Sequence, residues 1–193
     1  MTIIAAAIKN GVVSIACDSQ FNLGSLKIDS KYRKNNDKLL KVNDSIIGLT
    51  GWCATTQILE HLAETEPSLF KLNTRWEIFE MLLTLHEKLK DYYFIETSEN
   101  SDQPVESNQL DGLIINQKGI FEFGSYREVH QYDRFWAVGS GKLLALGAMH
   151  ALYETDACAM TIVEAGVKSA AEFDDGCSLP LKSMCIELET SNI

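Results

Sequence analysis

Apolar and polar positions alternate in blocks along the first twenty residues. Ile3–Ile8 and Val12–Cys17 are apolar runs, and the pair Asn10-Gly11 separates them. Short apolar runs on both sides of Asn-Gly are typical of a β-hairpin with a tight turn. The pattern therefore predicts two buried antiparallel strands, and the second of them should bring Asp18 back beside Thr2.

Four later segments carry apolar residues at helical spacing, three to four positions apart. In the second of them, Thr74 is followed three residues later by Glu77, which predicts a capping box at the helix start. The expected helices are Trp52–Glu64, Thr74–Tyr93, Ser140–Tyr153 and Thr161–Glu172.

Further strands are predicted between these helices, at Ser45–Leu49, Leu110–Asn116, Gly119–Phe123, Phe135–Val138 and Leu181–Leu188. We interpret Phe21–Ser30 as an irregular hairpin or loop, Tyr32–Val42 as a basic, partly extended segment, and the acidic stretch Glu96–Gln109 as a mobile surface loop. Strands followed by paired helices, twice over, indicate an α+β protein. We expect residues 1–193 to form a single domain.

Composition narrows the classes of protein to consider. The chain has 193 residues, 46% of them hydrophobic, and a net charge of −10. The negative charge argues against a nucleic-acid partner. The five cysteines are odd in number and contain no Cys-x-x-Cys pair, which favours reduced thiols in a cytoplasmic protein. No apolar run approaches the roughly 20 residues that cross a membrane, so we expect no membrane partner.

The second residue carries the candidate chemistry. Removal of Met1 would leave Thr2 with a free α-amine, whose reference pKa is about 8. An N-terminal threonine combines a nucleophilic hydroxyl with its own base, since the amine can accept the hydroxyl proton directly or through a water. The sequence motif alone is common, and it gains weight from Asp18, Lys34 and Gly51, which the predicted strands bring toward it.

Several short motifs together carry a resemblance to a known family. They are Thr2-Ile3-Ile4, Asp18-Ser19-Gln20, Leu23-Gly24, Arg33-Lys34, Gly48-Leu49-Thr50-Gly51 and Ala137-Val138-Gly139-Ser140-Gly141. In these residues the chain resembles the proteasome-type N-terminal nucleophile hydrolases, and among them the bacterial peptidase HslV and its homologues. The resemblance implies a four-layer αββα sandwich and a threonine-type endopeptidase that acts on proteins and peptides.

The resemblance also implies a role for each site residue. Thr2 would be the nucleophile, Asp18 and Lys34 would orient it and lower its proton affinity, and the Gly51 amide would stabilise the oxyanion. Ser140 would hydrogen-bond near the threonine amine, with support from Asp174, although the Ser-Gly-Gly that usually follows this aspartate is replaced by Gly176-Cys177-Ser178.

Each of these residues also has an interpretation without catalysis. Asp18 and Asp174 are ordinary turn formers at the end of a strand and of a helix. Gly51 suits a tight turn between strand and helix, and Ser140 is a common helix N-cap. The resemblance favours the catalytic interpretation.

Substrate and partners follow from the same resemblance. The pocket beside Thr2 would be lined by Phe21, Tyr32, Leu49 and Cys53, which predicts a preference for apolar side chains. Subunits would assemble into homo-oligomeric stacked rings, hexameric or heptameric. The sequence has no ATPase motif, so an unfoldase would be a separate protein. No cofactor and no metal are expected, although HslV-type proteins can hold a monovalent cation on backbone carbonyls near Asp174.

Two other functions remain open at the level of the sequence. One is a catalytically silent, proteasome-like shell protein, and the other is an N-terminal nucleophile amidase that acts on a small molecule. The presence of Thr2, Asp18 and Lys34 argues against the shell protein, and a retained Met1 would exclude the threonine mechanism because Thr2 would then have no free amine. Turnover of small amides would identify the amidase.

Overall fold

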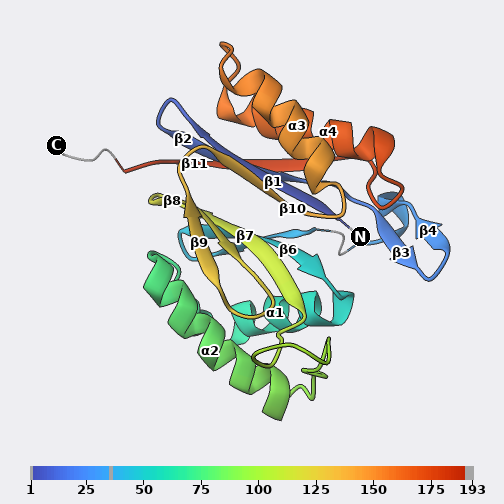
Figure 1. Cartoon of the computed structure of the whole chain (residues 1–193), viewed down its shortest axis with the longest axis vertical. Helices are drawn as coiled ribbons and strands as arrows, with labels where there is room; N and C mark the ends of the chain where they lie inside the picture. Colours follow the sequence, from blue (N-terminus) through green and yellow to red (C-terminus); the bar gives the residue numbers. More distant parts are fainter. Residues whose placement is uncertain (1, 35–36, 190–193) are drawn as a thin grey trace.

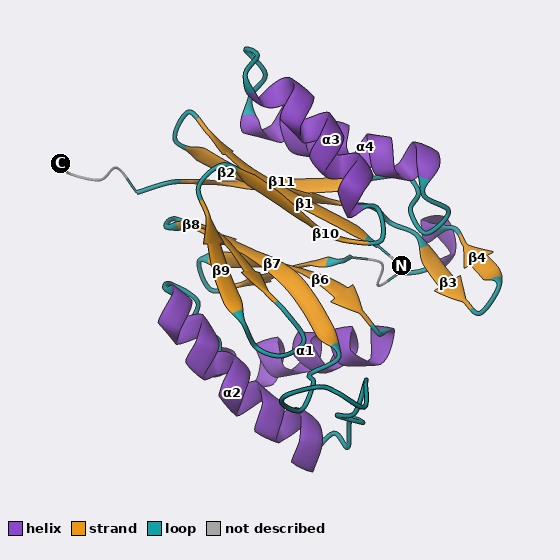
Figure 2. Ribbon diagram, viewed as in Figure 1, coloured by secondary structure: helices purple, strands orange, loops and turns teal. Residues whose placement is uncertain are grey.

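Two β-sheets stacked face to face form the centre of the molecule. The computed structural model describes residues 2–34 and 37–189, and its helices lie in pairs on the outer faces of the two sheets (Figures 1 and 2). The chain is therefore the four-layer αββα sandwich that the resemblance implied.

The first sheet contains the N-terminal hairpin and has the order β10-β1-β2-β11. All its neighbouring strands are antiparallel. The strands are β1 (Ile3–Lys9), β2 (Val12–Cys17), β10 (Phe135–Gly139) and β11 (Lys182–Glu187), and the helices on its outer face are α3 (Lys142–Tyr153) and α4 (Ala159–Phe173).

The second sheet has the order β5-β6-β7-β8-β9, also antiparallel throughout. Its strands are β5 (Leu39–Val42), β6 (Ser45–Gly51), β7 (Leu110–Asn116), β8 (Gly119–Phe123) and β9 (Val129–Tyr132), covered by α1 (Cys53–Thr65) and α2 (Arg75–Asp91). Strand β9 was not predicted, because only Val129 of its four residues is buried and the strand lacks an apolar run.

Shorter elements complete the chain. A separate hairpin of β3 (Phe21–Leu23) and β4 (Leu26–Ile28) stands beside the start of β1 (Figure 1), and short 3₁₀ turns follow at Ser30–Tyr32 and Pro67–Leu69. Within the segment that was expected to be partly extended from Tyr32, Tyr32 ends a 3₁₀ turn and the strand begins only at Leu39.

Strand β1 is buried on both faces, which explains its continuous apolar run. Because side chains alternate along a strand, Ile3 and Ala5 pack toward α3 and α4, whereas Ile4 and Ala6 pack between the two sheets. A third apolar cluster fills the space between the second sheet and α1 and α2. The N-terminal end of β1 is therefore held by packing on both sides.

The segment Glu96–Gln109 has no helix or strand, as the sequence predicted, but side chains fix its last part to α2. His86 lies between the two partners that hold it: its Nδ1 is 2.5 Å from Asn108 Oδ1 and its Nε2 is 3.0 Å from Glu106 Oε2. Lys90 forms an ion pair with Glu106 at 2.7 Å. The segment thus leads into β7 along a fixed path.

The predicted capping box is confirmed at the start of α2. The Thr74 hydroxyl accepts from the Glu77 amide at 3.2 Å, and the Glu77 carboxylate accepts from the Thr74 amide at 3.1 Å.

None of the helices in the described residues is long and apolar enough to cross a membrane.

Candidate active site

Thr2 lies immediately before β1, at one end of the space between the two sheets. Its side chain and backbone are 8% exposed. Ile3 pairs with Gly139 of β10, which places Ser140 next to Thr2. The Ser140 hydroxyl is 3.4 Å from both the nitrogen and the carbonyl oxygen of Thr2. Gly139 has a φ of +102°, and a side chain there would overlap the Thr2 carbonyl oxygen, so the close approach requires glycine.

Asp18 is brought to the same place by β2. Cys17 pairs with Ile4 in the β1–β2 ladder, so the next residue stands beside Ile3. The Asp18 carboxylate, 1% exposed, accepts from the backbone N–H groups of Ile3 at 3.0 Å and Gln20 at 2.8 Å. It also accepts from the Ser178 N–H at 3.2 Å. A buried carboxylate needs such donors to offset its lost hydration.

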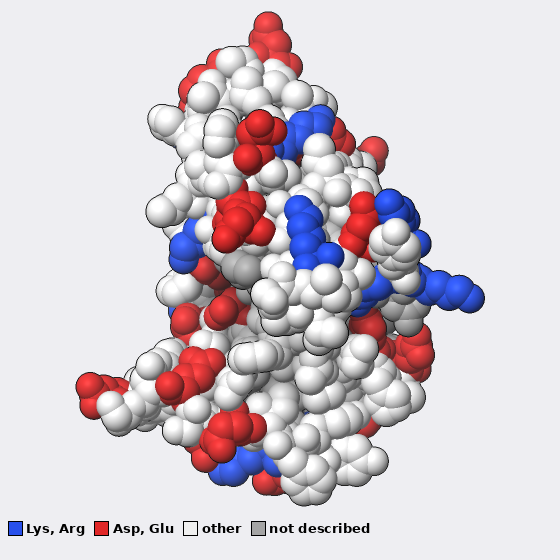
Figure 3. Space-filling view, turned by 90° about the vertical axis from the view of Figure 1, so that its right-hand side faces the viewer, with Lys and Arg blue, Asp and Glu red and all other residues white. Residues whose placement is uncertain are grey.

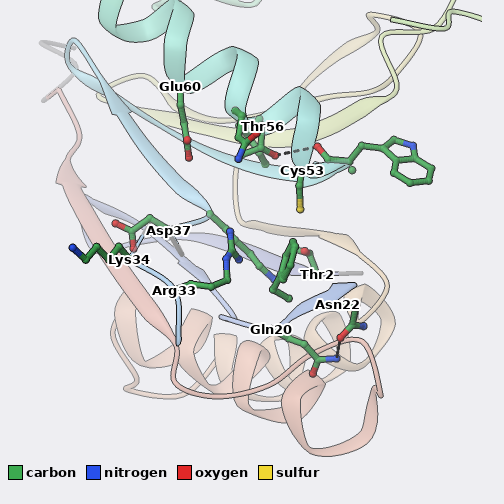
Figure 4. A pocket seen from close by; sticks show the side chains of 15 residues that line it. Thr2, Gln20, Asn22, Arg33, Lys34, Asp37, Cys53, Thr56 and Glu60 are labelled. Carbon is green, nitrogen blue, oxygen red and sulfur yellow. Dashed lines mark hydrogen bonds between the residues drawn. The ribbon is translucent and has the colours of Figure 1, made fainter. Parts of the chain in front are cut away.

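The lysine that reaches Asp18 is Lys38, not Lys34. Lys38 Nζ lies 2.7 Å from Asp18 Oδ1, and the Lys38 side chain is 15% exposed. Lys34 is exposed, and in Figure 4 its side chain points away from Thr2. The expectation that Lys34 would converge on Asp18 is therefore wrong in the geometry of this chain.

Strand register explains the difference. Leu39 pairs with Gly48, and the carbonyl of Lys38 accepts from the Leu49 N–H at 3.1 Å. The residue held against the second sheet as it reaches the site is thus Lys38.

Gly51 ends β6 and faces the same cavity as Thr2. Its φ is +121°, and a Cβ atom there would lie 2.9 Å from the carbonyl oxygen of Gln109. The position therefore requires glycine for its backbone conformation and for its packing. Helix α1 begins two residues later at Cys53, and the first N–H groups of a helix have no partner within it.

A cavity of about 570 Å³ opens beside Thr2. Phe21, Leu49 and Cys53 line it, as the resemblance implied. Tyr32 is not among its lining residues and is 76% exposed. Its expected place is taken by Arg33, whose guanidinium carbon lies 4.0 Å from the centre of the Phe21 ring.

The lining is more polar than the sequence predicted. Besides the residues just named, it includes Gln20, Asn22, Thr56, Gln57 and Glu60. Figure 4 shows Thr56 and Glu60 on the α1 side of the cavity, and Arg33 and Thr2 on the opposite side. The expectation of a purely apolar pocket is corrected, because it rested on four positions and omitted the rest of the α1 face.

Asp174 lies near the site, but its contacts differ from those expected. It ends α4, and its Oδ1 accepts from the Gly176 N–H at 2.6 Å. Within the described residues, the side-chain partner found for the Ser140 hydroxyl is the Cys177 thiol, with Oγ and Sγ 3.9 Å apart. The support that Asp174 was expected to give Ser140 is thus replaced by a contact from Cys177.

The sequence analysis did not identify Cys177 as a contact of Ser140. Its thiol is buried, and burial raises its pKa to about 12, with the nearby carboxylate of Asp18 acting in the same direction. The thiol is therefore neutral at physiological pH. Its position directly after the Asp174–Gly176 turn was the only available signal.

Charges around the site are balanced locally rather than gathered into a patch. The face that carries the β3–β4 hairpin shows acidic and basic side chains interspersed with broad uncharged areas (Figure 3). In residues 2–34 and 37–189, no group of three or more His, Cys, Asp or Glu is placed to hold a metal ion.

The whole chain was then compared with known proteins. A family model described as "Proteasome subunit" matches residues 1–187. The chain belongs to the proteasome subunit family. No curated protein matches it.

Solved structures agree with this family assignment. BPH of Thiobacillus denitrificans in complex with epoxomicin is 33% identical, with a TM-score of 0.89 over 98% of this chain and 100% of that chain. A second BPH structure from the same organism is 35% identical, again with a TM-score of 0.89, over 97% and 98% of the two chains. Eukaryotic HslV from Trypanosoma brucei shares the fold, with 21% identity and a TM-score of 0.74 over 96% and 99%. Family membership supports a proteasome-type peptidase subunit.

Proposed function

We propose that this proteasome-family chain is a threonine-type endopeptidase subunit whose nucleophile is Thr2. The observation that carries the proposal is the grouping around Thr2. A buried Asp18–Lys38 pair lies beside it, Ser140 contacts its backbone, and a cavity shared with Gly51 opens in front of it. These are the parts that acyl transfer from a peptide to a hydroxyl requires.

In the proposed reaction, removal of Met1, which lies outside the described residues, frees the Thr2 amine. The Thr2 hydroxyl attacks the scissile carbonyl carbon, and its proton passes to that amine. The developing oxyanion accepts a hydrogen bond from the Gly51 N–H. Collapse of the tetrahedral intermediate expels the leaving amine, which takes up the proton. A water molecule then hydrolyses the ester on Thr2 and restores the free hydroxyl.

Lys38 takes the role that the sequence analysis gave to Lys34. Its positive charge beside Thr2 disfavours a protonated amine, which must be neutral to accept the hydroxyl proton. Asp18 holds Lys38 by an ion pair and holds the start of β1 through the Ile3 N–H. Ser140 and Cys177 are positioning residues in this proposal, because Ser140 contacts the backbone of Thr2 and Cys177 contacts Ser140.

Assembly into homo-oligomeric stacked rings of six or seven subunits is part of the proposal. Large apolar side chains are exposed on the outer helices, among them Trp76, Leu143 and Phe173. Exposed apolar surface of this kind marks interfaces between subunits. Light scattering at micromolar concentration tests the assembly: a mass near the 21.5 kDa of one chain, with peptidase activity intact, would contradict it.

The test of the catalytic role is substitution of the nucleophile. Thr2→Ala should remove peptide hydrolysis and labelling by epoxomicin, the compound bound in the BPH structure, while the circular dichroism spectrum stays unchanged. Hydrolysis above about one thousandth of the wild-type rate would contradict the role, since loss of a nucleophile costs more than this. Wild-type turnover of small amides without peptide cleavage would favour the amidase, and the absence of both would favour the shell protein.

A further inference from the structure

The backbone of Gln109 and Leu110 lies directly against Gly51. Leu110 is the partner of Gly51 in the β6–β7 ladder. A Cβ atom on Gly51 would lie 2.9 Å from the Gln109 carbonyl oxygen and 3.4 Å from the Leu110 Cα atom. Because Gly51 is the last residue of β6, a shift of Gln109 and Leu110 would move the Gly51 amide with them.

Gln109 has a backbone conformation that needs support from its surroundings. Its φ is +53°, in the left-handed region that residues other than glycine seldom adopt. Such a conformation persists only where neighbouring contacts hold it, and residues of this kind are frequent at functional sites. One contact is local, since the Gln109 N–H donates to the Ser107 hydroxyl at 2.8 Å. Ser107 itself is fully buried.

A second support is Arg127, in the turn between β8 and β9 and only 9% exposed. None of the salt bridges in the described part of the chain includes this arginine. Its Nη1 instead donates to the Glu106 carbonyl oxygen at 2.6 Å and to Asn108 Oδ1 at 3.4 Å. A buried charge is costly unless it is hydrogen-bonded, so these two acceptors and Arg127 hold one another in place.

Asn108 connects this arginine to α2 as well. Its Oδ1 is 2.5 Å from His86 Nδ1, and its backbone N–H donates to the Ser125 carbonyl oxygen at 2.7 Å. Asn108 is 1% exposed. The residue immediately before Gln109 is therefore fixed both from α2 and from the turn that carries Arg127.

We propose that Arg127 is a positioning residue for the oxyanion donor. Through Asn108 it fixes Gln109 and Leu110, and these hold the Gly51 amide in the direction of the oxyanion. The inference rests on the peptidase function proposed above and adds a residue that does not line the cavity. The oxyanion forms only during the reaction, so a misplaced amide lowers kcat rather than raising KM.

The test compares peptide hydrolysis by the wild type and Arg127→Met, with active sites counted by epoxomicin labelling. In Arg127→Met, kcat per labelled site should fall by about tenfold to a hundredfold, the range for a displaced catalytic group, while KM changes less than about threefold. Affinity for a peptide aldehyde, whose adduct with Thr2 places an oxygen at the oxyanion position, should fall by a similar factor. The matching peptide alcohol forms no adduct and should bind as it does to the wild type.

Two further variants test the path and the chemistry. Asn108→Ala removes the shared acceptor and should show the same split between kcat and KM. The double variant should lose little more kcat than the worse single variant, because both substitutions act through one contact. Arg127→Lys retains a charged donor and should recover part of the kcat that Arg127→Met loses.

Arg75→Met is the matched control, because Arg75 is exposed at the start of α2 and should leave kcat within about twofold of the wild-type value. If Arg127 were only structural, its loss would lower the melting temperature and leave kcat per labelled site unchanged. That result, in whichever of Arg127→Met and Asn108→Ala folds, overturns this inference alone, as does an equal loss of affinity for aldehyde and alcohol. A wild type that cleaves no peptide and takes up no epoxomicin overturns the proposed function as well.

Discussion

The ammonium nitrogen of Lys38 lies 2.7 Å from Oδ1 of Asp18, and the Asp18 carboxylate is buried directly beneath the start of β1. The same oxygen accepts from the Ile3 N–H at 3.0 Å. One carboxylate thus joins the lysine to the residue that follows Thr2. The position of the proposed nucleophile and the charge beside it depend on the same group.

Replacement of this lysine should therefore affect both stability and activity. Lys38→Met leaves Asp18 buried without its cation, which typically costs about 3–5 kcal/mol in the free energy of unfolding. The backbone donors to Asp18 should keep the loss near the lower value. Peptide cleavage should disappear in the folded protein, because the charge beside the Thr2 amine is lost. Urea unfolding and a peptide assay measure the two effects.

Lys34→Met is the control for that experiment. Lys34 is exposed, so its loss should change the free energy of unfolding by about 0.5 kcal/mol or less. Most of the peptide cleavage should remain. If Lys34→Met abolished cleavage and Lys38→Met did not, the lysine assigned from sequence spacing would be the functional one after all.

Gly51 gives a second prediction. Gly51→Ala forces an L side chain into a φ of +121° and within 2.9 Å of the Gln109 carbonyl oxygen. Backbone strain of this kind costs about 1–3 kcal/mol, and movement of the Gly51 amide should lower kcat far more than it changes KM. The melting temperature and the two kinetic constants are the measurements.

The same substitution at Gly147 provides the contrast. Gly147 lies within α3, and a Cβ atom there would meet nothing within 4 Å. Gly147→Ala should stabilise the protein by up to about 1 kcal/mol, because alanine has the higher helix propensity. Equal effects of the two substitutions would show that the Gly51 conformation is not the cause of any loss.

Sequence reasoning succeeded where the pattern of side chains determines the outcome. The apolar runs of β1 and β2 fixed a hairpin, and the hairpin alone brings Asp18 beside Thr2. The capping box was likewise predictable from Thr74 and Glu77 alone. Four helices and most of the strands follow from such local patterns, whereas the arrangement of the strands in two stacked sheets came from the resemblance.

Prediction from the sequence failed for the segment between Ser30 and Lys38, which has no regular pattern of apolar and polar residues. Arg33, Lys34 and Lys38 all line the cavity and Tyr32 does not, and of the two lysines it is Lys38 that pairs with Asp18. The spacing of apolar residues does not determine which of two nearby lysines pairs with a given carboxylate. Glu60 was missed for another reason: it lies on a helix, where an isolated glutamate is usually a solvent-exposed residue.

The ion pair of Glu106 predicts that residues 96–109 are held less firmly at low pH. Hydrogen bonds from Lys90, and then from His86, lower the pKa of the Glu106 carboxyl from 4.5 to about 2. Because the pKa is lower in the folded state, the stabilising effect is complete above about pH 5 and is lost as the pH falls toward 2. Residues 96–109 should then become more accessible.

Pepsin digestion of the wild type and of Glu106→Gln between about pH 2 and pH 5 measures this effect. At the upper end, the variant should be cut faster within residues 96–109. At the lower end, the two proteins should be cut at the same rate, because Glu106 is protonated in the wild type as well. A difference in rate that is constant across the range would contradict the role of this ion pair.

The cysteines should differ in their reactivity. A hydrogen bond from the Thr161 side chain lowers the pKa of Cys158, which is exposed at the start of α4. Burial raises the pKa of Cys17 to about 11 and that of Cys177 to about 12. Since the thiolate is the reactive form, iodoacetamide at neutral pH should label Cys158 well before either buried thiol. Peptide mass spectrometry after timed quenching gives the order, and labelling of Cys177 at the rate of Cys158 would contradict it.

The central claim is that Thr2 acts as an N-terminal nucleophile, and the intact mass of the purified protein tests it most directly. Before treatment, the mass should correspond to the chain without Met1. After incubation with epoxomicin, it should increase by one inhibitor molecule per subunit in the wild type and not in Thr2→Ala. A wild-type mass that retains Met1 in full, with no adduct, would contradict the account, because Thr2 would then have no free amine to act as its base.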